Sequence, residues 1–292
     1  MSGVAWALVA AVCFGFTQAM NRKSNQLVDA YRTAFGMLVA VEILLIARAL
    51  ITAEFSRLAG APVSSWLYFS AATFIHFVAG WTLIALSQQR VGVARTGALV
   101  AAAPLVGALL AVPILGESLT FLTLLGVLVT VGGVAMVSFS SASQKTLGWR
   151  MPWFALTVAV LWGTTPQLIR LGLQGLDAPL LGLTIGLAVS LVVQAVGLTI
   201  ARAWHRAPVP RNAYRWMAVG GVTGAMAISA QWISFDLTTV AIALTVQQLA
   251  TIVVVGLAPL MFRDPVERIN TLLLGGAAAM LAGSVVVVLA GR

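Results

Sequence analysis

The sequence predicts an all-α polytopic membrane protein with ten transmembrane helices, arranged as two inverted five-helix repeats. Of its 292 residues, 60% are hydrophobic and only 9% are charged, whereas soluble domains are roughly 45 to 50% apolar. Apolar runs of about 20 residues, long enough to cross hydrocarbon, alternate with short basic clusters. The single cysteine, Cys13, lies in the first apolar run, so neither a disulfide nor a cysteine-ligated metal is expected.

Each apolar run should form a helix, because hydrocarbon offers backbone polar groups no water partner. The predicted helices span residues 3–20, 31–51, 65–87, 92–113 and 119–138 in the first half, and 152–171, 178–201, 214–236, 239–261 and 269–290 in the second. The run at 3–20 is interpreted as a true first span rather than a secretory signal, since its basic cluster follows the apolar residues.

The two halves also resemble each other. Residues 11–22 read AVCFGFTQAMNR and residues 159–170 read AVLWGTTPQLIR, an offset of 148 that later drifts to 150. The strongest evidence for a repeat comes from matched charged and tryptophan residues, since small residues match easily by chance. These pairs are Arg22 with Arg170, Asp29 with Asp177, Trp66 with Trp216 and Glu117 with Glu267. Because each repeat holds an odd number of helices, the second must enter the membrane upside down. We therefore expect two repeats, residues 1–146 and 147–292, in one integrated membrane domain that works by alternating access.

Basic residues are distributed unevenly between the two predicted faces. Thirteen of the 17 Lys and Arg residues fall in the odd-numbered loops, and each half shows this bias separately. The positive-inside rule places those loops in the cytoplasm and both termini outside. Topology thus explains the net charge of +9, and no nucleic-acid partner is expected, since no long basic run or aromatic-basic platform occurs.

Several motifs resemble the drug/metabolite transporter (DMT) superfamily, and more narrowly its EamA-type members. They are Phe14-Gly15, Trp162-Gly163, the stretch LGESLT at 115–120 and the five-plus-five layout. The YddG-like amino-acid exporters look most similar. The resemblance implies the EamA/DMT fold, a cavity lined mainly by helices 1 to 4 and 6 to 9, and cytoplasmic termini, so the side of the termini stays open. The chain departs from aromatic-exporting members at Ala101–Ala103, where they carry bulky aromatics.

Two ionisable side chains lie deep in the predicted spans. Glu42 is about 11 residues, or ~16 Å, inside its helix, and His76 lies at similar depth in the next. Ionisable groups at this depth are costly and mark functional positions by default. Glu42 and His76 are therefore candidates for substrate binding and for proton coupling, through a proton shared between them. The alternative is that they satisfy each other or nearby backbone as structural glue.

Further candidates for substrate binding are uncharged. Trp162 is mid-helix beside Gly163, where its ring face suits stacking on a substrate side chain or cation, and Trp81 lies part-way into its helix. Plain core packing is the alternative for Trp162. Amides at similar depth suit a zwitterion without the desolvation cost of a fixed charge, or hydrogen-bond between helices. They are Gln194, Gln247 and Gln248.

Proline and glycine positions complete the structural expectations. Pro104 and Pro166 are expected to kink their helices and to free backbone carbonyls. Small residues are expected to form seams that let helices pack closely. These are Gly126, Gly132 and Gly133 in the fifth helix, and Gly275, Ala279 and Gly283 in the tenth.

Together these features predict a secondary transporter of the bacterial cytoplasmic (inner) membrane that exports small zwitterionic metabolites such as amino acids. An organic-cation or drug exporter and a lipid-linked substrate flippase are the alternatives. Only His76 and His205 supply imidazoles, and hydrolase and phosphate-loop motifs are absent, so no enzyme activity, metal or cofactor is expected. The expected partners are a small-molecule solute and the lipid bilayer, and a monomer is expected to suffice.

Overall fold

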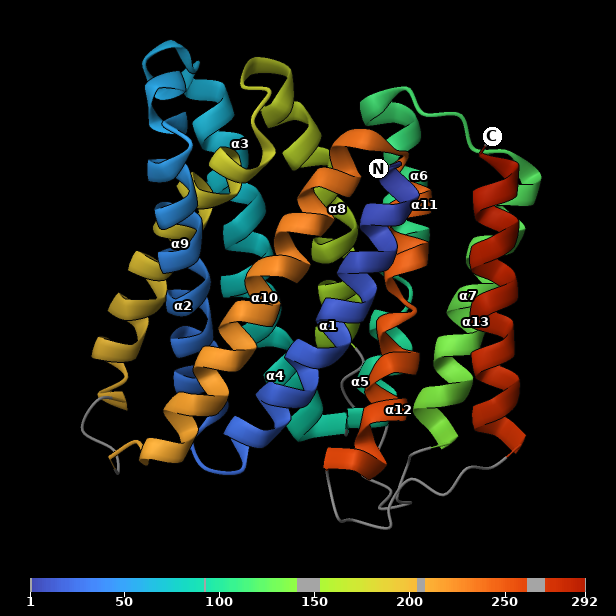
Figure 1. The fold of residues 1–292 in the computed structure, drawn as a ribbon. Helices are drawn as coiled ribbons and strands as arrows, with labels where there is room; N and C mark the ends of the chain where they lie inside the picture. Colours follow the sequence, from blue (N-terminus) through green and yellow to red (C-terminus); the bar gives the residue numbers. More distant parts are fainter. Residues whose placement is uncertain (1, 92, 141–152, 204–207, 262–270, 292) are drawn as a thin grey trace.

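The protein is helical throughout the part that its computed structural model describes, residues 2–91, 93–140, 153–203, 208–261 and 271–291 (Figure 1). The first half contains α1 (Gly3–Asn25), α2 (Ala30–Ile51), the 3₁₀ segment η1 (Glu54–Gly60), α3 (Val63–Thr73), the π-helical segment η2 (Phe74–Gly80), α4 (Trp81–Val91), α5 (Val93–Val100), α6 (Ala103–Leu115) and α7 (Phe121–Ser140). The second half contains α8 (Trp153–Gly175), α9 (Pro179–Ile200), α10 (Arg211–Leu237), α11 (Val240–Gln247), α12 (Ala250–Met261) and α13 (Thr271–Ala290).

Within the described residues, eight helical segments are long and apolar enough to cross a membrane. This confirms the prediction of an all-α, multi-pass membrane protein, while ten spans and their inverted arrangement stay predictions. The two predicted spans outside these eight are α8 and α10, of 23 and 27 residues. Both carry polar side chains that are buried in protein, such as Gln167 and Gln231. The predicted boundary between the repeats, at residues 146 and 147, lies outside the described residues.

Three predicted single helices are divided into shorter segments. The helix predicted at 65–87 consists of α3, η2 and α4, the one at 92–113 of α5 and α6, and the one at 239–261 of α11 and α12. The last two are broken at residues 101–102 and 248–249, within three residues of the offset of 150 that the repeat shows on either side. The fourth predicted helix of each half is therefore interrupted.

Pro104 explains the first break. Proline has no backbone N–H, and its ring clashes with the carbonyl four residues earlier, here that of Val100, the last residue of α5. Pro104 accordingly stands in the first turn of α6. No proline lies at the second break, and nothing in its local sequence explains it. Pro166 is buried inside α8, which continues across it without interruption.

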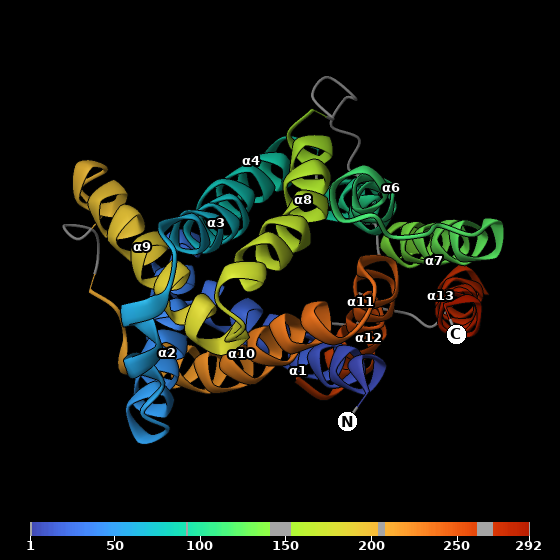
Figure 2. The same cartoon turned by 90° about the horizontal axis from the view of Figure 1, so that it is seen from above.

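Seen end-on, the helices form two rows (Figure 2). One row holds α3, α4, α8 and α6, the other holds α2, α10, α1 and α12, α9 lies at one edge, and α7 pairs with α13 at the opposite edge. The largest buried cluster lies where α2, α3, α8, α9 and α10 meet, and it includes Phe69, Trp232 and Phe235. Tilted stacking of Phe69 on Trp232, with ring centroids 5.6 Å apart, joins the two rows.

The edge pair α7 and α13 packs along glycines. A Cβ atom on Gly133 would lie 2.6 Å from the Gly276 carbonyl oxygen, and a Cβ on Gly283 would lie 2.6 Å from that of Gly126. Backbones approach this closely only where side chains are absent. The expected small-residue seam is therefore present between these two helices.

Some of the glycines at the contact between α7 and α13 differ from those predicted, and this difference allows a test of the contact. Gly132 meets nothing within 4 Å, and Gly276 rather than Gly275 faces the α7 backbone. Gly133→Ala should destabilise the protein by about 1–3 kcal/mol through overpacking. Gly132→Ala is the matched control and should be neutral or slightly stabilising, since Ala is the better helix former. Thermal unfolding in detergent measures both, and equal effects would show that the helices do not meet at Gly133.

Candidate functional site

An aromatic cluster surrounds His76 in the middle of the third predicted span. The imidazole stacks on the Trp162 indole from α8, with ring centroids 5.1 Å apart and planes 15° from parallel. Phe77 lies edge-on to His76 at 4.6 Å, and Trp81 lies edge-on to Phe77 at 5.5 Å. Three candidates from the sequence, His76, Trp81 and Trp162, are thus brought together, and His76 and Trp162 are only half-buried.

The π-helical segment η2 makes this cluster possible. A π-turn widens the helix and frees backbone carbonyls from their usual partners, and such turns occur often at functional sites. Trp162 Nε1 donates to the His76 carbonyl oxygen at 3.2 Å, and Gln194 Nε2 lies 3.5 Å from the Phe77 carbonyl oxygen. Gly80 lies directly against the Trp162 ring, so a side chain there would displace the indole. Gln194 therefore joins the same group of residues.

Glu42 is buried, and its carboxylate has no polar partner in the part of the chain that the structure describes. Its side chain is on α2, which packs against α9 and α10, and the residue is 6% exposed. Within the described residues, neither carboxylate oxygen of Glu42 accepts a hydrogen bond, and His76 Nδ1 has no partner either. The expected hydrogen-bonded sharing of a proton between Glu42 and His76 is thus not present in this conformation. An unpaired buried carboxylate is strongly disfavoured as an anion.

Amide side chains gather at the break between α11 and α12. Gln247, the last residue of α11, accepts a 2.7 Å hydrogen bond through Oε1 from Nε2 of Gln231 on α10, and both side chains are buried. In the described part of the protein, Nε2 of Gln247 has no acceptor. Gln248 Nε2 lies 3.4 Å from the carbonyl oxygen of Ala101, so it bridges the two helix breaks.

Sequence reasoning missed two amides that share these surroundings. Gln231 and Gln167 lie only a few residues from the predicted ends of their helices, which placed them near the membrane surface. In the structure both are buried, and Gln167 Nε2 donates to the Gly107 carbonyl oxygen at 2.7 Å. The available signal was an amide in an otherwise apolar helix, the same signal that identified Gln247.

Comparisons with known proteins support a transporter fold. Residues 1–139 match the EamA-like transporter family, which supports placement in the DMT superfamily and suggests a membrane transporter rather than an enzyme. The chain is similar to a crystal structure of a protein that is 15% identical, with a TM-score of 0.80 over 99% of this chain and 97% of the other. At that identity the likeness concerns the fold alone. No curated protein matches the sequence at a significant level.

Proposed function

We propose that this protein is a secondary transporter of the bacterial inner membrane, which exports small zwitterionic metabolites such as amino acids by alternating access. In this proposal α8 and α10 also cross the bilayer, so that residues 1–146 and 147–292 form two inverted five-helix units. The observation that carries the proposal is that residues paired by the sequence repeat make paired contacts.

The clearest paired contacts lie on α1 and α8. A Cβ on Gly15 would lie 3.2 Å from the Ala250 carbonyl oxygen, and a Cβ on Gly163, its repeat counterpart, would lie 2.9 Å from that of Ala103. Ala103 and Ala250 themselves correspond, since they begin α6 and α12 after the two breaks. The contact thus recurs with the two halves exchanged. Such exchange is what a two-fold axis in the membrane plane produces.

The helix pairs follow the same rule. A Cβ on Gly126 would lie 2.8 Å from the Gly283 carbonyl oxygen, and this approach maps onto that of Gly276, whose Cβ would lie 2.7 Å from the Gly133 carbonyl oxygen. α1 packs on α10, as its counterpart α8 packs on α3, and α2 packs on its own counterpart α9. When two similar units are related in this way, the conformation open to one side of the membrane and the conformation open to the other have nearly equal energies. This favours alternating access.

The paired helix breaks are the best candidate for the solute site. Interrupted helices in corresponding positions of two repeats mark the binding centre in many transporters. Here the two breaks are bridged by Gln248. The Nε2 amide of Gln247, which has no acceptor among the described residues, is a donor for a carboxylate or carbonyl. Trp162 and His76 supply ring faces in the aromatic cluster, and Trp81 and Gln194 support them. These neutral groups favour a zwitterion or neutral solute.

Solute uptake into lipid vesicles that carry the purified protein in their membrane tests the proposed function. The panel contains amino acids, sugar phosphates and quaternary amines, and we expect amino acids to exchange. Transport of quaternary amines alone would favour an organic-cation exporter, which the unpaired carboxylate of Glu42 would suit. Transport of sugar phosphates alone, or of no solute, would contradict the proposal.

A further inference from the structure

A polar junction joins the two halves on the face that carries both termini (Figure 1). α6 ends at Leu115 and is followed by Gly116, whose φ of +69° lies in the left-handed region that glycine tolerates. The reversed turn directs Glu117 toward the first residue of α11, where the Val240 N–H lies 3.0 and 3.1 Å from its two carboxylate oxygens. A negative charge at a helix N-terminus is favourable. Glu117 of the first half therefore caps a helix of the second.

Arg170 of α8 completes the junction. Its Nη1 donates to Glu117 Oε1 at 2.9 Å and to the Thr238 carbonyl oxygen at 3.0 Å. The Glu117 side chain is 11% exposed and that of Arg170 is 31% exposed. Burial raises the pKa of the Glu117 carboxyl, while the Val240 N–H and the Arg170 charge oppose that rise.

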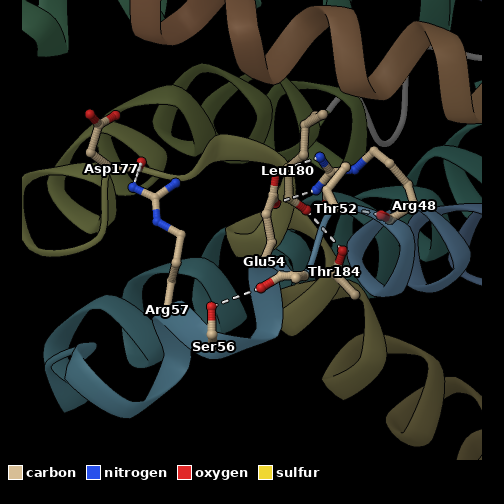
Figure 3. Close-up of polar contacts among 9 residues, drawn as sticks. Arg48, Thr52, Glu54, Ser56, Arg57, Asp177, Leu180 and Thr184 are labelled. Atoms are coloured by element: carbon tan, nitrogen blue, oxygen red, sulfur yellow. Dashed lines mark hydrogen bonds and ion pairs between the residues drawn. The ribbon is translucent and has the colours of Figure 1, made fainter.

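A second link between the halves lies on the same face (Figure 3). Arg57 in η1 donates through Nη2 to the Asp177 carbonyl oxygen, in the turn between α8 and α9, at 2.8 Å. η1 is held in turn by a two-fold hydrogen-bonded ion pair between Arg48 and Glu54, which also keeps the pKa of Glu54 below its usual range. The links between the two halves on this face thus include polar bonds between turns and helix ends.

We infer that Glu117 and Arg170, with the Val240 N–H, form a latch that holds the solute pathway closed on the terminus-bearing face and opens when the transporter switches. The inference rests on the proposed function. Both charged groups reach water once the turns separate, so hydration compensates for much of the lost ion pair. The α7–α13 seam differs, because its close contacts are between backbones and cannot part by rotation of side chains.

Cysteine labelling tests the latch in the full-length protein. Ser234 is 0% exposed, and its carbonyl accepts the Thr238 N–H one turn below the junction. In a Cys13→Ala, Ser234→Cys background, Glu117→Gln should raise the rate of labelling by a membrane-impermeant maleimide about 10-fold, as expected for loss of hydrogen bonds to a charged group. Arg170→Gln should do the same, and Arg170→Lys should raise the rate less.

Asp29→Asn is the matched control, since Asp29 lies at the opposite end of α1, away from this junction, and pairs with Arg32 of its own half. It should leave the labelling rate unchanged. The latch is refuted if Glu117→Gln and Arg170→Gln proteins still transport solute but label no faster than the parent. If labelling accelerates in both variants while no variant moves any solute, the latch stands and the proposed transport function fails.

Discussion

Glu42→Gln should give a folded protein whose solute transport no longer responds to a proton gradient. Glu42 is 6% exposed, and neither oxygen has a hydrogen-bond partner among the described residues. α9 has no ionisable side chain, and those of α10 lie near its ends, so within the described residues neither of these helices brings a countercharge to Glu42. Since a buried unpaired carboxylate costs several kcal/mol, Glu42 should load and release a proton as the site opens. Glutamine has nearly the same shape as glutamate but does not take up or release this proton.

Counterflow and gradient-driven uptake at several pH values measure this effect. Exchange of solute should persist in Glu42→Gln, whereas accumulation driven by the gradient should disappear. Asp29→Asn removes a carboxylate outside the membrane-spanning helices and should leave both activities unchanged. A Glu42→Gln protein that still accumulates solute with the parental pH dependence would show that Glu42 has only a structural role.

Trp162→Ala should have the second largest effect, on both stability and solute binding. The substitution removes the ring that stacks on His76 and the donor to the His76 carbonyl oxygen. Truncation of a buried aromatic costs roughly 3–5 kcal/mol, and the half-buried Trp162 should fall near the lower end. Loss of aromatic stacking, at about 0.5–1.5 kcal/mol, should also weaken solute binding roughly 2- to 13-fold.

Two further substitutions separate binding from packing. Trp162→Phe keeps a ring on His76 and should recover most of the solute affinity. Trp232→Phe alters a tryptophan that is 2% exposed and packed on Phe69 in the core, so it should lower stability without changing affinity. Half-saturation of transport and thermal unfolding are the readouts. If Trp162→Ala lowers stability and leaves half-saturation unchanged, Trp162 serves packing alone.

The general architecture could be predicted from the sequence because each membrane-spanning helix requires a long apolar run. The sequence was less informative about what interrupts these helices. Pro104 predicted a kink where the helix in fact breaks, but the break at residues 248–249 has no proline, and the π-helical segment around His76 has no sequence signal that we recognise. Such features depend on packing against neighbouring helices.

The candidate site could be predicted only in part, because it also depends on how the helices pack against one another. His76, Trp81, Trp162 and Gln194 were chosen one by one for their depth, and depth along a helix says nothing about which helices meet. Their gathering around η2 depends on α8 packing against α3 and α4. Glu42 and His76 were expected to be partners because their helices are consecutive, yet no hydrogen bond joins them. Neighbouring helices do not fix the directions of their side chains.

The central claim is that the two halves lie in opposite orientations in the membrane. Gln26 and Gln174 are exposed residues at corresponding ends of α1 and α8, at an offset of 148. Single cysteines placed at these positions in a Cys13→Ala background should react with an impermeant maleimide from opposite sides of the membrane. Labelling of both from the same side would contradict the inverted repeat and the alternating access built on it.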